Sequence, residues 1–366
     1  MCSKVFGTGG AHRIGRPVRR DRVTLVGGTV LAVAGFALFL TFGLPGIPGA
    51  SPEGDASASG NAIDSVYWFI FAFAAFFFLL IEAALVVFTI RYRRRRGTPD
   101  DVEGPQIHGN TRLELFWTIV PVLGLIAIAT YAFVQLPDVR AARASSSARA
   151  VTVRVEAHQF YWEYKYANGA IALDVLRLPV DRPVLLKIVT YDVEHSWWVP
   201  ELDGKIDAVP GQTNVLEFTP TETGTYDHGK CAELCGIQHA VMTTKVVVVP
   251  GDEFDSWVDE TASEQQGANV ALGKATFGAV CAKCHGFDGS GDVGPPIQGN
   301  GTLLNESSLR QLVEQGQDTA NFDYYMPPVG RGWPKQQFDA LVAFIKQSKT
   351  LSNPPKTTGG AGGSTG

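Results

Sequence analysis

The stretch Cys231-Ala-Glu-Leu-Cys235-Gly-Ile-Gln-His239-Ala-Val-Met242 holds two thiols, an imidazole and a thioether within a short part of the chain. His195, in the upstream segment His195-Ser-Trp-Trp, adds a second imidazole from what we expect to be another loop. Thiolates favour soft or intermediate metals, and a weak methionine ligand tunes copper sites that transfer electrons. One thiolate serves a mononuclear copper site, whereas two thiolates can bridge two copper ions. The stretch therefore predicts a binuclear copper centre.

Two other interpretations of this stretch deserve comparison with copper. Cys231 and Cys235 could form a disulfide in an oxidising compartment, and the same donors could bind zinc. Neither interpretation accounts for Glu233, Gly236 and Met242 together, so copper is preferred.

The second motif, Cys281-Ala-Lys-Cys284-His285, is the attachment signature of c-type haem. Its cysteines form thioethers with the haem, and His285 is placed to bind the iron. Met326, in Tyr325-Met326-Pro327-Pro328, is the only methionine after the motif and is the predicted second axial ligand. A six-coordinate, low-spin iron suits electron transfer. The alternative, a thioredoxin-like redox motif, requires a βαβ context and no adjacent histidine.

Three apolar stretches are long enough to cross a bilayer, which takes about 20 residues. They cover residues 23–42, 66–90 and 115–136. The arginine cluster at 91–96 follows the second stretch and is expected to stay cytoplasmic, which places everything after about residue 137 outside. The first stretch fits either a signal peptide or a retained helix.

The pattern changes after the third apolar stretch. Short alternating strands separated by turn signals in residues 151–250 predict a sandwich or Greek-key barrel. From about residue 269 the pattern becomes helical, with amphipathic segments at 307–315 and 334–347. The second segment has an apolar face formed by Phe338, Leu341, Val342 and Ile345.

The copper stretch, preceded by His195-Ser-Trp and Asp207-Ala-Val-Pro-Gly211, resembles subunit II of haem-copper cytochrome c oxidases over about residues 62–250. The resemblance implies a cupredoxin sandwich outside two membrane helices. It also implies that Glu233 binds copper through its backbone carbonyl, with its carboxylate facing a magnesium ion at the junction with subunit I. The side-chain copper ligands implied are His195, Cys231, Cys235, His239 and Met242. The haem region resembles the small class I cytochromes c.

Two further features match the same family. Glu114 starts the third apolar stretch, where the family has a glutamate near a proton path into subunit I; an acid snorkelling at a helix end is the alternative. Phe160, Tyr161 and Trp162 are candidates for the electron-entry and relay surface, or they pack over the copper site. Many family members have tryptophan in place of Phe160.

The predicted fold is multi-domain: a transmembrane helical hairpin, an all-β cupredoxin Greek-key sandwich and an all-α class I cytochrome c domain. The predicted segments are a basic N-terminus with a signal peptide or extra transmembrane helix (1–60), the hairpin (61–137), the cupredoxin domain (138–250), an acidic linker (251–268), the cytochrome c domain (269–350) and a disordered tail (351–366).

These features predict the subunit of a terminal respiratory oxidase through which electrons enter, of the caa3 type by resemblance. Electrons would pass from haem c to the copper pair and on to subunit I, which reduces oxygen to water and pumps protons. Expected partners are subunits I and III and a reductant, either soluble or membrane-bound cytochrome c or a cytochrome bc complex. The expected location is a bacterial cell membrane, with copper and haem on the outer side.

Two alternatives remain at this stage: a subunit of a copper-containing nitric oxide reductase and a free-standing membrane-anchored electron carrier. The basic clusters flank apolar runs, so no nucleic-acid binding is expected.

Overall fold

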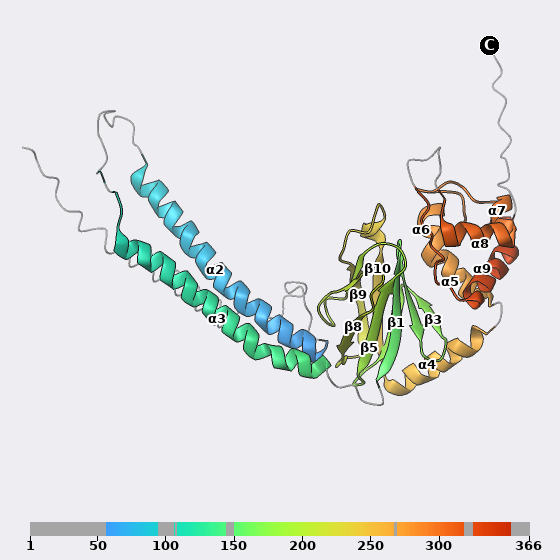
Figure 1. The fold of residues 1–366 in the computed structure, drawn as a ribbon, viewed down its shortest axis with the longest axis horizontal. Coiled ribbons are helices and arrows are strands. Elements are labelled where there is room, and N and C mark those ends of the chain that lie inside the picture. Colours follow the sequence, from blue (N-terminus) through green and yellow to red (C-terminus); the bar gives the residue numbers. More distant parts are fainter. Residues whose placement is uncertain are drawn as a thin grey trace, which may run out of the picture. The chain divides into compact units, whose positions relative to one another are not determined.

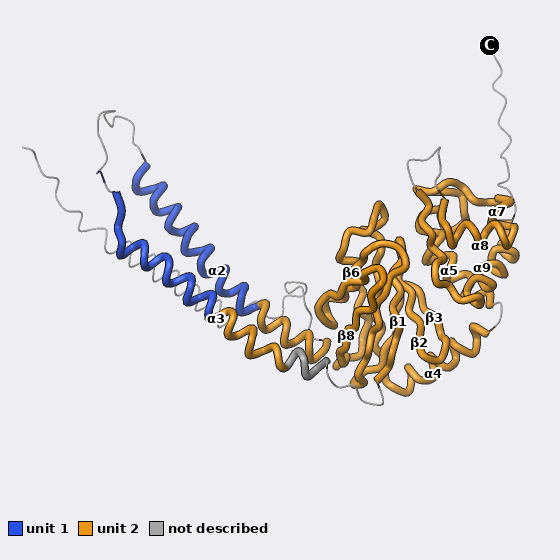
Figure 2. Tube along the Cα trace, in the orientation of Figure 1, with its two compact units in different colours: residues 1–50, 68–126 blue, residues 51–67, 127–366 orange. Residues whose placement is uncertain are grey.

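The computed structural model describes residues 56–93, 106, 108–143, 150–266, 269–317 and 325–352. Figure 1 shows two long helices, then a β-region, then a group of shorter helices. The first apolar stretch, Cys2 and nearly all of the predicted tail lie outside the described residues. The described chain forms two compact units, residues 68–126 and residues 56–67 with 127–352, which are coloured separately in Figure 2.

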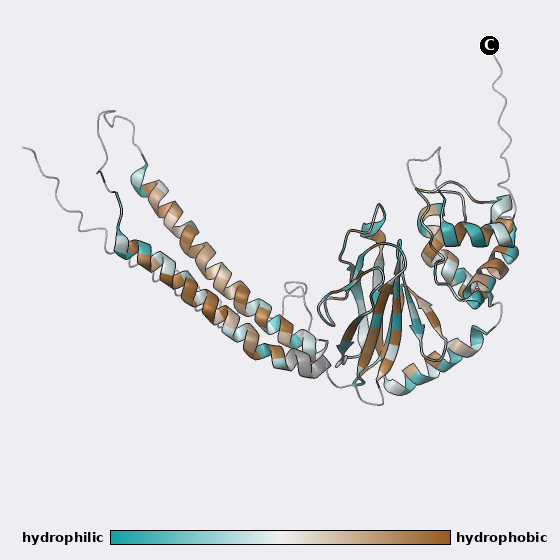
Figure 3. Cartoon of the chain, in the orientation of Figure 1, coloured by the Kyte–Doolittle hydropathy of each residue, from teal (hydrophilic) through white to brown (hydrophobic). Residues whose placement is uncertain are grey.

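The two long helices are apolar along most of their length (Figure 3). They are α2 (Ala58–Tyr92) and α3 (Thr111–Arg143), and they contain the second and third predicted spans. Phe78, Ile90 and Phe133 are each more than 60% exposed. At about 1.5 Å per residue, each helix exceeds the roughly 30 Å of a bilayer's hydrocarbon core. These helices anchor the chain in a membrane, as the sequence predicted.

The β-region consists of two five-stranded sheets. The first has the order β3-β2-β1-β5-β8 and the second the order β4-β10-β9-β6-β7. β1 pairs with β5, and β4 with β10, in parallel; the other pairings are antiparallel. The strands are β1 (Val151–His158), β2 (Tyr161–Tyr166), β3 (Ile171–Leu173), β4 (Val175–Pro179), β5 (Val184–Thr190), β6 (His195–Trp198), β7 (Ile206–Ala208), β8 (Asn214–Phe218), β9 (Gly224–Cys231) and β10 (Thr243–Val249).

Two large aromatic residues in the core of the sandwich, Trp197 and Tyr164, have paired polar atoms. Trp197 donates from Nε1 to Tyr164 Oη at 3.0 Å, and Tyr164 Oη lies 2.5 Å from Thr244 Oγ1. Both aromatic side chains are fully buried. Buried polar groups need such partners, so these bonds fix the positions of β2, β6 and β10 relative to one another. The predicted all-β sandwich is confirmed.

The acidic segment after the sandwich is a helix, α4 (Gly251–Glu264), with Asp252 and Glu253 in its first turn. Acidic side chains are favourable there because they lie at the positive end of the helix dipole. Phe254 is buried in the core of the sandwich, and Trp257 packs against the same core. This segment is therefore a packed helix and not an extended tether.

The C-terminal region is helical, as predicted. Its elements are α5 (Val270–Thr276), the π-helical turn η2 (Phe277–Cys281), α6 (Ala282–His285), α7 (Gly301–Leu304), α8 (Glu306–Gln315), α9 (Lys335–Gln347) and α10 (Lys349–Ser352). Asn269, Asn300 and Asn305 cap the starts of α5, α7 and α8 with their side chains. The predicted apolar face of α9 is buried, since Phe338, Leu341, Val342 and Ile345 are all less than 10% exposed.

Helices α5 and α9 approach so closely that only glycine fits between them. A Cβ atom on Gly273 would lie 1.9 Å from the carbonyl oxygen of Ala340 in α9. Gly273→Ala should therefore force the two helices apart and cost about 1–3 kcal/mol of folding free energy. Thermal unfolding of the haem region in the full-length chain, followed by circular dichroism, would measure this loss.

Gly278→Ala is the matched control, because a Cβ there would meet only the edge of the Phe287 ring at 3.8 Å. Equal melting temperatures for the two variants would contradict the close contact of α5 with α9.

Candidate functional site

The ends of three neighbouring strands position the predicted copper ligands. β9 ends at Cys231, β10 starts just after Met242, and β6 starts at His195. Cys231 and Met242 close the loop between them, because the Cys231 amide donates to the Met242 carbonyl at 2.9 Å. The 3-10 turn η1 (His239–Val241) places His239 within the same loop.

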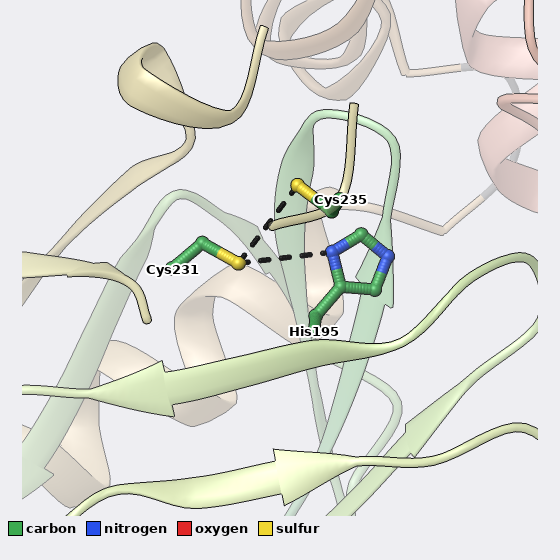
Figure 4. Close-up of side chains that lie close together, drawn as sticks. All are labelled: His195, Cys231 and Cys235. Carbon is green, nitrogen blue, oxygen red and sulfur yellow. Dashed lines mark hydrogen bonds between the residues drawn. The ribbon is translucent and has the colours of Figure 1, made fainter. Parts of the chain in front are cut away.

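The sulfur atom of Cys231 faces both Cys235 and His195 (Figure 4). Cys231 Sγ lies 3.9 Å from Cys235 Sγ and 3.9 Å from His195 Nδ1. Cys235 Sγ lies 3.6 Å from His239 Nδ1 and 3.7 Å from Met242 Sδ. Each thiol therefore has its own imidazole, and the thioether lies on the Cys235 side.

These distances fit metal coordination rather than a disulfide. An S–S bond is about 2.05 Å long, so the 3.9 Å separation excludes one between Cys231 and Cys235 in this structure. Ligand atoms that share a metal ion at about 2.0–2.3 Å lie roughly 3.3–4 Å apart, as these do. Two soft sulfurs, each with its own imidazole, suit two copper ions better than one tetrahedral zinc. The donor set therefore fits the predicted copper pair.

The backbone around the site fits the same arrangement. The carbonyl oxygen of Glu233 lies 3.1 Å from Cys231 Sγ, so it faces the sulfur pair. The hydrogen bond with Cys235 lowers the pKa of the Cys231 thiol to about 3, and the same contact raises the pKa of Cys235.

Asp192 orients the histidine ligand, a role that the sequence analysis missed. Its Oδ1 lies 2.8 Å from His195 Nε2, which leaves Nδ1 of the buried ring facing Cys231. Burial lowers the pKa of His195, but the hydrogen bonds and charges of Asp192 and Cys231 together outweigh this effect and the pKa is raised. A carboxylate behind a metal-binding histidine is a common way to fix the ring. Its position three residues before His195 was the available signal.

The haem motif lines a large pocket in the C-terminal region. The pocket has an empty volume of about 1380 Å³, part of which is open to solvent. Cys281, Cys284, His285 and Met326 all line it, and most of its other lining residues are apolar.

The histidine of the haem motif is held by the loop at residues 294–296. His285 Nδ1 lies 2.7 Å from the Pro295 carbonyl oxygen. A Cβ on Gly294 would lie 2.9 Å from the His285 ring. The hydrogen bond fixes the ring so that Nε2 is the nitrogen left to bind iron. The pocket and its histidine therefore fit a c-type haem.

The predicted aromatic stretch divides between the two sites. Trp162 is buried edge-on to His195, with 6.2 Å between the ring centroids. Tyr161 belongs to the apolar core of the C-terminal helical region, and Phe160 lines the haem pocket. Gln159, which was not predicted, donates from Nε2 to the Cys235 carbonyl at 2.6 Å and also lines the haem pocket.

Glu114 has a local structural contact at the start of α3. Its Oε1 accepts a hydrogen bond from the Asn110 amide at 3.2 Å, and Asn110 Oδ1 accepts from the Leu113 amide. These are capping contacts, which supports the helix-end alternative. A role in a proton path stays a prediction.

Comparison with known proteins agrees with this geometry. The family model for the cytochrome c oxidase subunit II transmembrane domain matches residues 53–134, and that for its periplasmic domain matches residues 171–249. Residues 268–345 match the model described as cytochrome c oxidase, cbb3-type, subunit III. Cytochrome c oxidase subunit 2 of Alkalihalophilus pseudofirmus is 32% identical, over 75% of this chain and 83% of the relative.

The chain belongs to the cytochrome c oxidase subunit II family. Another relative, cytochrome c oxidase subunit 2 of Synechocystis, is 29% identical over 60% of this chain and 79% of its own length. Among solved structures, the periplasmic domain of subunit II of cytochrome oxidase from Bradyrhizobium japonicum is 29% identical. It matches 31% of this chain and 94% of its own, with a TM-score of 0.30.

As a member of this family, the chain is one subunit of a haem-copper oxidase, and it associates with subunit I in a membrane complex. Its cofactors are copper in the cupredoxin domain and haem c in the C-terminal domain.

The Asp192 contact gives a test of the copper site. Asp192→Asn should weaken the hold on the His195 ring and lower copper affinity about 10–100-fold, the usual effect of losing such a partner. Retention of copper against a graded series of chelator, together with copper EPR, would measure the loss. Glu194→Gln removes a neighbouring exposed carboxylate and should change nothing. Equal retention by the two variants would show that Asp192 does not support the site.

Proposed function

We propose that this chain is the subunit through which electrons enter a caa3-type oxidase in a bacterial cell membrane, with both cofactor domains on the outer side. Copper and haem c each accept and release single electrons when bound. Subunit III, and a cytochrome c or cytochrome bc complex as the reductant, complete the proposed assembly. The observation that carries the proposal is that Gln159 and Phe160 line the haem pocket, while Gln159 also donates a hydrogen bond to the Cys235 carbonyl. Cys235 lies in the copper loop, defined here as residues 231–242.

Each predicted ligand has a proposed role. The copper pair is held by the side chains of Cys231, Cys235, His195, His239 and Met242 and by the carbonyl of Glu233. The Glu233 carboxylate faces a magnesium ion at subunit I. Cys281 and Cys284 attach the haem, and His285 and Met326 bind its iron. The protein's own part is to fix the ligands and limit water around them, because the chemistry is electron transfer and needs no general base.

Purification of the complex from its native membrane tests this function. A large polytopic subunit should accompany the chain, and the preparation should consume oxygen with reduced cytochrome c as donor. Its copper EPR signal should show one electron shared by two copper nuclei. Turnover of nitric oxide in place of oxygen, isolation of the chain alone, or a single-copper hyperfine pattern would each overturn the proposal.

Met326→Ala tests the axial ligand separately. The thioethers are untouched, so the haem should stay attached, but the iron loses its soft ligand. We expect an altered spin state in the optical and EPR spectra and a lower reduction potential. An unchanged spectrum would mean that a different residue binds the iron.

A further inference from the structure

The outer face of β2 is covered by the haem domain, defined here as residues 269–352. Tyr161 is fully buried, and it belongs to the apolar core of that domain rather than to the sandwich. Its hydroxyl donates to the Val329 carbonyl at 2.6 Å and accepts from Trp333 Nε1 at 2.7 Å. A buried tyrosine hydroxyl with two partners in one orientation is a specific contact. We call this group the Tyr161 anchor.

A second contact joins the haem motif itself to the sandwich. Lys283 lies between the two haem-attaching cysteines, and its Nζ lies 2.6 Å from Asp174 Oδ2 and 3.0 Å from the Phe160 carbonyl oxygen. Both partners of the ion pair are about four-fifths buried. Solvent screens such a pair much less than an exposed one. We call this contact the Lys283 latch.

Asp174 also contacts residues that lie next to the predicted copper ligands. Its Oδ1 accepts from the Trp162 amide at 2.9 Å, and Trp162 packs edge-on to His195. Its own carbonyl accepts from the Thr244 hydroxyl, two residues after Met242. The latch thus ties the haem motif to β2, which packs against His195, and to β10, which begins just after Met242.

Gln159 and Phe160 fill the space between the haem pocket and the copper loop. Both residues line the pocket. Gln159 donates to the Cys235 carbonyl, and a Cβ on Gly236 would lie 3.0 Å from the Phe160 ring. One side of this dipeptide therefore faces the haem site, and the other touches the residues at Cys235.

Helix α4, which connects the sandwich to the haem domain, is held against the sandwich by hydrogen bonds at and just after the helix. Gln265, just after α4, bonds to both backbone groups of Ile171 in β3: it accepts from the amide at 2.8 Å and donates to the carbonyl at 2.8 Å. Asn168 donates to the Val258 carbonyl within α4 at 2.9 Å. The chain is therefore bound to the sandwich along α4 and as far as Gln265.

We propose that Lys283 and Asp174 are positioning residues that, with the Tyr161 anchor, hold the haem domain in one fixed place on the sandwich with the haem pocket over Gln159 and Phe160. This rests on the proposed function, in which the haem domain feeds the copper pair. A fixed position removes the search that a loosely tethered domain must make before each transfer. It also covers the sandwich surface at Phe160, so an external donor must deliver its electron to the haem domain.

Distances between labels on the two domains of the complete oxidase test this directly. Cysteines replacing exposed Glu222 in the sandwich and exposed Lys335 in the haem domain would carry Gd³⁺ labels, in a Cys2→Ser background. The enzyme is measured fully reduced. A single narrow distance distribution is expected. A broad distribution in the otherwise unmodified enzyme would overturn the proposal.

Substitutions of Lys283 and Asp174 then test whether these two residues hold the haem domain in place. Lys283→Met and Asp174→Asn should each broaden the distribution; asparagine suits position 174 because its backbone has φ of 56°. Electron transfer from flash-reduced haem to the copper pair should slow about 10-fold or more in each and become sensitive to solvent viscosity. The double variant should be little worse than either single one, since both remove the same contact. Lys346→Met, at an exposed lysine of α9, is the control and should leave both readouts unchanged.

The outcomes distinguish the docking of the haem domain from the proposed order of electron flow. Latch variants that keep the narrow distribution and the rate would overturn the roles of Lys283 and Asp174. A narrow distribution that depends on the latch, but with no electron passing from haem to copper, would leave the docking in place and overturn the proposed order of electron flow.

Discussion

Strand β2 is buried on both of its faces, and the relation between the two cofactor sites depends on this. Successive side chains of a strand point to opposite faces. Trp162 and Tyr164 enter the core of the sandwich, whereas Tyr161 enters the core of the haem domain. One strand therefore serves two apolar cores. Any shift of its register by one residue would exchange the two sets of side chains and break both cores at once.

Strands β1 and β2 also carry a buried charged cluster that resembles a metal site. Ligand atoms of Glu156, His158 and Glu163 lie within 4.8 Å of one another. The ammonium of Lys165, however, lies 2.6 Å from a Glu156 oxygen and 3.1 Å from a Glu163 oxygen, where a cation would bind. Burial alone would raise the pKa of Glu156, but contacts with His158, Lys165 and Arg154 lower it to about 2. The cluster is a balanced ion network, and removing one member would strand a buried charge at a cost of about 3–5 kcal/mol.

The sequence predicted the features whose signal is local. The copper stretch, the haem motif and the apolar face of α9 are patterns within a few turns or one loop, so spacing alone identifies them. The contacts between the domains could not be found in that way. Lys283 and Asp174 are 109 positions apart, and Tyr161 and Trp333 are 172 apart. Only the folded chain brings them together, and a lysine between two cysteines or an aspartate after a strand carries no signal of its partner.

The departure at Phe160 has a physical reason in this arrangement. The Phe160 ring lies against Gly236 on one side and lines the haem pocket on the other, and the residue is only 8% exposed. A tryptophan at this position would have to place its extra atoms against Gly236 or in the haem pocket itself. Adding atoms to a packed site forces neighbours apart and costs about 1–3 kcal/mol. The phenylalanine ring fits between Gly236 and the haem pocket and touches both.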